Sequence, residues 1–189
     1  MWQAETYDRQ TIDRELGWAG GLGFNTLRVF LHDLVWSHDA GGFAGRLDDF
    51  LSIADRYGMK VMFVLFDDCH RPDPLIGPQP LPIPTIHNSG WKHSPGQKLV
   101  LQFHEGAAPA GERERLEAYV QGVLRRFAGD PRILMWDIYN EPGQSDNGDK
   151  SNAFLSLAWR WAEEARPSQP LTACLDGAVG ERNIALNAE

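Results

Sequence analysis

Long apolar runs are missing from this sequence, and none approaches the roughly 18 residues that a membrane-spanning helix needs. The first ten residues, MWQAETYDRQ, have neither a basic start nor an apolar stretch, so we expect no export signal in them and leave the compartment open. Positive charge is scarce, because 18 Lys and Arg oppose 26 Asp and Glu, for a net charge of -8. The few basic residues are scattered, so we expect neither nucleic acid nor a membrane as partner.

Four short apolar runs alternate with amphipathic segments, and each is predicted to be a buried strand. Their hydrophobicity is continuous rather than alternating, which is typical of parallel strands covered by helices. The predicted strands span residues 26–31, 60–66, 133–139 and 171–175. Between them, apolar residues recur at helical spacing, as in Leu116, Val120 and Val123. The fold class is therefore predicted to be α/β, with the strands parallel, adjacent in chain order and linked by right-handed crossovers.

Cysteine is almost absent, since the chain has only Cys69 and Cys174. The predicted strands place these residues near strand ends with one strand between them, about 10 Å apart at about 4.8 Å per strand. A disulfide needs Cα atoms within about 7 Å of each other. We therefore expect two unpaired thiols, and the redox compartment stays undetermined.

The segment at about 68–111 interrupts the alternation of strands and helices. It is rich in Pro, Gly and His and shows no helical periodicity. Loops longer than about 15 residues are usually functional or disordered, and this one follows the carboxyl end of a strand, where parallel α/β folds bind ligands. We predict a binding loop over the active site rather than a disordered insertion. It contains Trp91, His70, His87, His93 and His104.

The segment Trp136 to Pro142, WDIYNEP, ends a predicted buried strand in Asn140 and Glu141. A carboxylate at the carboxyl end of such a strand faces the ligand side of the sheet. Pro142 biases Glu141 toward extended geometry and ends the strand, which would hold the carboxyl group at the rim. Glu141 is therefore a candidate catalytic acid.

Two motifs resemble the retaining glycoside hydrolases of the (β/α)₈ barrel clan, in particular the cellulase-like and mannanase-like family 5 enzymes and the related barrel domains of family 2. Residues 23–30, GFNTLRVF, are similar to the second strand of that family, and residues 136–142 are similar to its fourth strand. With the helix spacing, the resemblance spans nearly the whole chain. It implies a single partial (β/α)₈ domain over residues 1–189, made of strands two to five with their helices.

The resemblance also implies a role for each matched residue. Glu141 would be the general acid and base, Asn140 would hydrogen-bond the sugar hydroxyl beside the reacting carbon, and Arg28 would orient the nucleophile. His32 follows Arg28 and Phe30 at period two, which brings it to the ligand-side rim as a substrate-binding residue, and Trp91 in the long loop could stack on a sugar ring. The expected partner is a carbohydrate substrate, with no cofactor and no metal.

Two departures from the family pattern shape this interpretation. The first strand of the family should precede a helix like the one predicted at Ile12 to Leu22, yet the chain opens at Met1 almost directly on that helix, and its 189 residues are fewer than the about 250 of a complete barrel. We therefore expect truncation at both ends. The nucleophilic glutamate of the family lies on strand seven, and the chain ends before it. Asp67, Asp68 and Asp176 lie near strand ends but are poor substitutes, because retention needs two carboxyls about 5 Å apart in defined positions. We expect a fragment with the nucleophile outside the chain and with open sheet edges that favour self-association.

Two other functions compete with a glycosidase fragment. One is a non-catalytic carbohydrate-binding or structural half-barrel that keeps the site residues as relics. The other is a metal-dependent hydrolase built on the loop histidines with Asp67 and Asp68, but no His-x-His or His-x-x-x-His pair occurs in the chain.

Overall fold

The computed structural model describes residues 1–69, 74–78, 81, 83–90 and 92–175. It contains one parallel sheet of four strands in the order β1-β2-β3-β4. The strands are β1 (Thr26–Phe30), β2 (Lys60–Asp67), β3 (Ile133–Asn140) and β4 (Leu171–Cys174). The predicted α/β class, strand order and parallel pairing are confirmed, and each predicted boundary lies within one residue of the observed one.

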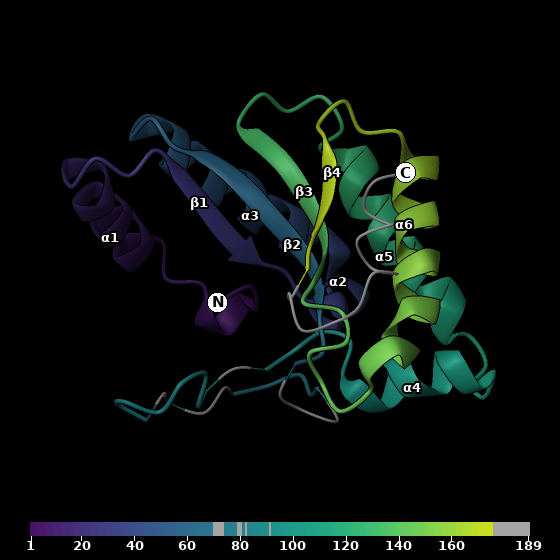
Figure 1. Ribbon diagram of the computed structural model, residues 1–189. Coiled ribbons are helices and arrows are strands. Elements are labelled where there is room, and N and C mark those ends of the chain that lie inside the picture. The colour runs from purple at the N-terminus through teal and green to yellow at the C-terminus, as the bar shows by residue number, and fades with distance from the viewer. Residues whose placement is uncertain (70–73, 79–80, 82, 91, 176–189) are drawn as a thin grey trace.

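Helices connect the strands, and Figure 1 shows the strands side by side from β1 to β4 with α1 beyond the β1 edge. The α-helices are α1 (Arg9–Gly21), α2 (Asp33–His38), α3 (Ala40–Arg56), α4 (Gln97–Glu105), α5 (Glu112–Arg126) and α6 (Asn152–Ala165). The described residues also form two short 3-10 helices, η1 (Ala4–Thr6) and η2 (Gly148–Ser151). Within the described residues, no helix is both long enough and apolar enough to cross a membrane.

Helix α4 corrects the prediction that the segment at about 68–111 has no helical structure. The helix has nine residues, and only Val100 is buried. Gly96 precedes it without a side-chain cap, so the usual start signal for a helix is absent. The helix is stabilised instead by tertiary contacts with α6 and η2, which local periodicity does not reveal.

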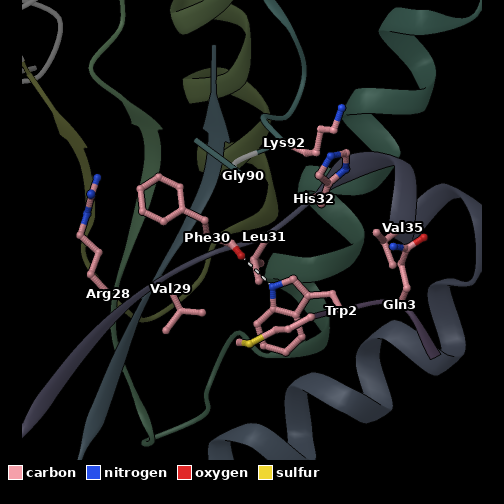
Figure 2. Close-up of a pocket in the computed structure, with 11 residues that line it drawn as sticks. Trp2, Gln3, Arg28, Val29, Phe30, Leu31, His32, Val35, Gly90 and Lys92 are labelled. Atoms are coloured by element: carbon pink, nitrogen blue, oxygen red, sulfur yellow. Dashed lines mark hydrogen bonds between the residues drawn. The ribbon is translucent and has the colours of Figure 1, made fainter. Parts of the chain in front are cut away.

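The outer edge of β1 is partly covered by the N-terminal segment. Trp2 is 4% exposed, and its indole Nε1 donates a 2.7 Å hydrogen bond to the carbonyl of Phe30 (Figure 2). Its ring also packs against Phe43, Phe50 and Phe63. The expectation that this strand leaves its edge open is therefore wrong at Phe30, because a side chain from far along the sequence satisfies that carbonyl.

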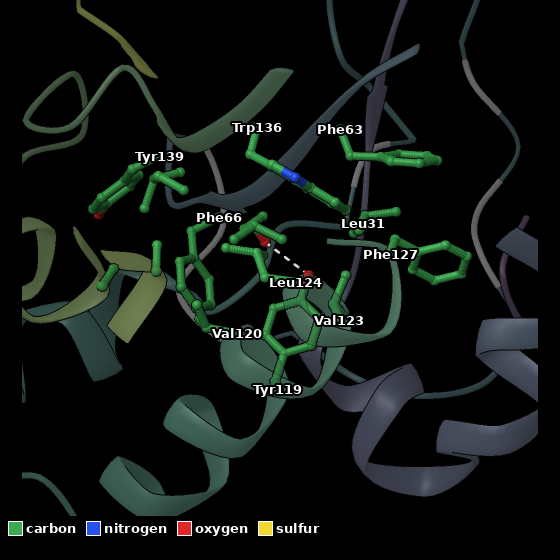
Figure 3. Close-up of a cluster of buried hydrophobic side chains, with 14 of the residues drawn as sticks. Leu31, Phe63, Phe66, Tyr119, Val120, Val123, Leu124, Phe127, Trp136 and Tyr139 are labelled. Atoms are coloured by element: carbon green, nitrogen blue, oxygen red, sulfur yellow. Dashed lines mark hydrogen bonds between the residues drawn. The ribbon is translucent and has the colours of Figure 1, made fainter. Parts of the chain in front are cut away.

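The core lies between the sheet and α3, α5 and α6. Helix α5 contributes Val120, Val123 and Leu124, which are fully buried and lie beside strand residues in Figure 3. Tyr119 is also fully buried, and its hydroxyl donates to the carbonyl of Leu65 at 3.1 Å. The last five residues of β2 and the last five of β3 are all buried, so the carboxyl ends of these strands, which present the polar residues described next, are anchored in the core.

Candidate active site

Arg28 on β1 and Asp137 on β3 form an ion pair across the sheet. The Asp137 carboxylate, 1% exposed, accepts from Arg28 Nε at 3.1 Å and from Nη2 at 2.5 Å. Its other oxygen accepts from the backbone amide of Cys174 at 3.2 Å. Burial raises the pKa of Asp137, and the Arg28 guanidinium opposes that rise. The pair fixes the Arg28 side chain, because a buried carboxylate needs a charged partner.

Asn140 lies at the end of β3 and is held by the same arginine. Arg28 Nη2 donates to Asn140 Oδ1 at 2.8 Å. Because Arg has only donors, the amide oxygen must face it, which turns the Asn140 Nδ2 group away from Arg28. Asn140 therefore presents its N–H donors in a fixed direction.

Glu141 follows directly, and its backbone is not extended as the sequence predicted. Its φ is 46°, in the left-handed region, because the chain turns sharply after β3. The Glu141 amide donates to the carbonyl of Cys174 at 2.6 Å, and its own carbonyl accepts from Gln144 at 3.0 Å. Positive φ is uncommon for residues other than glycine and occurs often at functional sites. The half-buried side chain contacts the thiol of Cys69, which approaches Oε2 at 3.6 Å.

A pocket of about 420 Å³ lies along β1 and the residues that follow it, and Trp2 also lines it. In Figure 2 the side chains of Arg28, Phe30 and His32 extend to the same side of this segment, as period two predicts. Glu141 is not among the residues that line this pocket, so Arg28 is the residue that connects the two parts of the site.

His32 caps the start of α2, and its Nδ1 accepts from the amide of Leu34 at 3.3 Å. Nδ1 also lies 3.6 Å from Asp33 Oδ1, but burial lowers the pKa of His32. We therefore describe His32 as a neutral ring with its proton on Nε2 rather than as half of an ion pair. Among the described residues, this buried Nε2 has no hydrogen-bond partner. It is a donor that a ligand in the pocket could satisfy.

Trp91 lies outside the described residues, although Gly90 and Lys92 on either side of it line the pocket. The end of the long loop is fixed to the sheet by polar contacts. His93 Nδ1 lies 2.8 Å from Asp67 Oδ1, and the Asp67 amide donates to the carbonyl of Ser94 at 2.6 Å. Ser94 Oγ also donates to the buried carboxylate of Asp33. The segment 92–95 therefore lies against the carboxyl ends of the strands.

The two aspartates at the end of β2, Asp67 within the strand and Asp68 directly after it, have partners of their own. Burial opposes ionisation of Asp67, yet the pKa of Asp67 is lowered because the hydrogen bond and charge of His93 outweigh it. The fully buried Asp68 accepts from Ser145 at 3.0 Å and from Asn147 at 3.3 Å. Both side chains tie loops to the sheet. Asp176 lies outside the described residues.

Metal ligands do not gather in the part of the chain that the structure describes, where no three His, Cys, Asp or Glu side chains lie close enough to hold an ion. His70 is outside that part. Neither Cys69 nor Cys174 forms a disulfide, as the sequence predicted.

Asp137 and Cys69 contact the site residues but were not predicted from the sequence to do so. For Asp137 a signal was available, because a charged residue inside an apolar strand requires a buried partner. Cys69 carried no comparable signal, since its contact with Glu141 joins residues 72 positions apart.

No family model matches this chain, and no curated protein matches it. Solved structures do. The endo-1,4-β-D-mannanase of Thermotoga petrophila RKU-1 matches with a TM-score of 0.55 and 14% identity, over 88% of this chain and 51% of that one. The fold is a partial (β/α)₈ barrel.

Other glycoside hydrolases show the same likeness. A family 5 mannosidase of Rhizomucor miehei matches with a TM-score of 0.56 and 15% identity, over 90% of this chain and 47% of that one. GH5_18 of Streptomyces cattleya, in complex with GlcNAc, matches with a TM-score of 0.58 and 16% identity, over 89% of this chain and 39% of that one. The chain thus spans about half or less of the length of these proteins.

Proposed function

We propose that this chain is part of a retaining glycoside hydrolase that cleaves a β-linked oligo- or polysaccharide, with Glu141 as general acid and base and the nucleophile outside residues 1–189. The observation that carries the proposal is the group of Arg28, Asn140 and Glu141 at the carboxyl edge of the sheet, on a fold shared with glycoside hydrolases.

The chemistry of the group suits glycosidic bond cleavage. The leaving oxygen of a sugar must be protonated as the bond breaks, and a positioned carboxylic acid contributes about 10² to 10⁴-fold to such a step. Asn140, turned by Arg28, can offer one N–H of its Nδ2 group to a sugar hydroxyl, while the other is directed to the sulfur of Cys69. Hydrogen bonds to the hydroxyl next to the reacting carbon strengthen in the transition state.

Substrate binding is assigned to the pocket beside β1. His32 offers its buried Nε2–H there, and we keep Trp91 as a candidate platform for a sugar ring. An aromatic face suits the apolar face of a pyranose, and a neutral imidazole N–H is a suitable donor to a hydroxyl.

The test joins this chain to the missing barrel strands that carry a strand-seven glutamate. Hydrolysis is measured with an aryl β-glycoside of a poor leaving group, such as phenol, and one of a good leaving group, such as dinitrophenol. If Glu141 is the acid, Glu141→Gln slows the phenyl substrate by about 10² to 10⁴-fold and the dinitrophenyl substrate much less. Equal slowing of both substrates would contradict that role.

The competing function is a half-barrel that only binds carbohydrate. The hydrolase and the binding module give different results in the joined protein, because a binding module binds the sugar without hydrolysing it. Binding of the oligosaccharide with no hydrolysis of either aryl glycoside would favour the binding module.

A further inference from the structure

The thiol of Cys69 lies between the two residues assigned to catalysis. Asn140 Nδ2 approaches Cys69 Sγ at 3.6 Å, and Cys69 Sγ approaches Glu141 Oε2 at 3.6 Å. Both distances are within reach of hydrogen bonds to sulfur. Cys69 itself is 7% exposed, so solvent does not compete strongly for these contacts.

The direction of these two hydrogen bonds follows from the groups involved. Asn140 Oδ1 is occupied by Arg28, so the amide must donate to sulfur through Nδ2. Burial raises the pKa of the Cys69 thiol far above its ordinary value, and neighbouring carboxylates, Asp67 first, act in the same direction. The sulfur therefore keeps its proton. Two carboxylates, Asp67 and Glu141, lie near the S–H as acceptors, and the contact from Sγ to Glu141 Oε2 is 3.6 Å.

We propose that Cys69 is a positioning residue that holds the carboxyl group of Glu141 through Oε2. The proposal rests on the proposed function, in which Glu141 is the proton donor. Arg28 donates to Asp137 and to Asn140, Asn140 donates to Cys69, and Cys69 donates to Glu141. The orientation of the acid is thus set from a buried carboxylate on β3, the strand that ends just before Glu141.

Holding only one oxygen has a chemical consequence. Among the described residues, Glu141 Oε1 has no hydrogen-bond partner, so it is left to face the leaving oxygen of a substrate. A thiol is a weak donor, so it orients the carboxyl group without binding it as tightly as an arginine would. A group that must release and recover a proton benefits from such a weak partner.

The experiment is infrared spectroscopy of the S–H stretching band, which moves to lower frequency when the thiol donates a hydrogen bond. Because the chain has two cysteines, Cys174→Ala leaves Cys69 as the single thiol. Two substitutions in this background change the acceptor of the S–H group. Glu141→Gln replaces the carboxylate by a neutral amide, and Glu141→Asp draws the carboxylate back from the sulfur by one methylene. Glu105→Gln, an exposed position at the end of α4, is the matched control, and circular dichroism checks the fold.

The expected result is a band that moves to higher frequency in both Glu141 variants and stays in place in Glu105→Gln. Asn140→Ala should move it as well, because the donor onto sulfur is lost. A band that stays in place in a folded Glu141→Gln or Glu141→Asp chain would overturn the proposal. Hydrolysis by the joined barrel is measured separately. If the S–H band moves as expected but the joined barrel shows no turnover, the proposed function fails while the contact between Cys69 and Glu141 is still supported.

Discussion

At the scale of single residues, the site is held by buried carboxylates whose partners come from distant parts of the chain. Asp137 is paired with Arg28, 109 residues away, and Asp68 with Ser145, 77 residues away. Each carboxylate lost its water on folding and regained only part of that solvation from hydrogen bonds. Substitutions at these two positions therefore test the account through stability and its pH dependence.

Asp137→Asn should lower the free energy of unfolding by about 1.5 to 3 kcal/mol, the usual value of hydrogen bonds to charged groups. The amide cannot match the carboxylate that accepts two N–H groups of Arg28. Urea unfolding measures the change, with Asp149→Asn, at an exposed position in η2, as control. Equal stability of the two variants would mean that the Arg28 pair does not hold the site.

Asp68 should make the chain less stable as pH rises. Burial raises its pKa above the ordinary 3.8, against hydrogen bonds that favour the charged form. The folded state therefore binds a proton more readily than the unfolded state, and stability falls as pH rises from 3.8 through the raised pKa. Asp68→Asn removes this pH-dependent contribution to stability. The pKa of Asp137 is also raised by burial, so the contribution of Asp137, which falls with rising pH in the same way, remains in the variant.

The measurement is urea unfolding of the chain and of Asp68→Asn at several pH values from about 4 to about 7, the range just above the ordinary pKa of an aspartate. The stability of the parent relative to the variant should decline across this range. A difference that is constant with pH would show that the Asp68 carboxyl titrates normally.

At the scale of elements, contact with the core decides which features the sequence could predict. β2 and β3 were predictable because almost every one of their residues is buried, which gives a continuous apolar run. α4 was not, since one buried residue in nine produces little periodicity. The turn at Glu141 was also missed, because its φ of 46° depends on the carbonyl of Cys174 on the neighbouring strand, which no local pattern records.

Two helical glycines should respond in opposite ways to alanine. A Cβ at Gly122 in α5 would lie 2.4 Å from the ring of Trp36, which is packed against Phe43 and Tyr119. Gly122→Ala should destabilise the chain by about 1 to 3 kcal/mol from overpacking, despite better helix propensity. Gly45 in α3 has nothing within 4 Å, so Gly45→Ala should stabilise by up to about 1 kcal/mol.

Thermal unfolding of both glycine variants gives the comparison. The parent chain should lie between them in midpoint temperature. If Gly122→Ala were as stable as Gly45→Ala, α5 would not pack on Trp36 as described.

At the scale of the whole molecule, the described residues form a sheet of four parallel strands that does not close into a barrel. No residue of α1 is buried, and apolar side chains are exposed on and after it, with Trp18 at 63%, Leu22 at 79% and Phe24 at 57%. Unpaired strand edges and exposed apolar surface favour association. The nucleophile that the resemblance places on strand seven was not matched to a residue of this sequence, and the chain spans about half of the mannanase that it is similar to.

We expect the isolated chain to self-associate with rising concentration, as measured by sedimentation velocity. Leu22→Lys with Phe24→Lys should weaken association, because charge would replace the apolar surface beside β1. Leu75→Lys with Leu81→Lys, in the long loop and similarly exposed at 66% and 87%, is the matched control. A parent chain that stays monomeric at all concentrations would contradict the open-edge explanation.

The central claim is that Glu141 is the proton donor of a site whose nucleophile lies outside these residues. The most direct test assays the purified chain and Glu141→Gln side by side on an aryl β-glycoside, with and without sodium azide as an external nucleophile. Without azide we predict equal rates, because proton donation supplies about 10² to 10⁴-fold of an acceleration that exceeds about 10⁶-fold in complete enzymes. With azide, the unmodified chain should be the faster of the two. Robust turnover without azide, abolished in Glu141→Gln, would place a nucleophile within residues 1–189 and contradict the account.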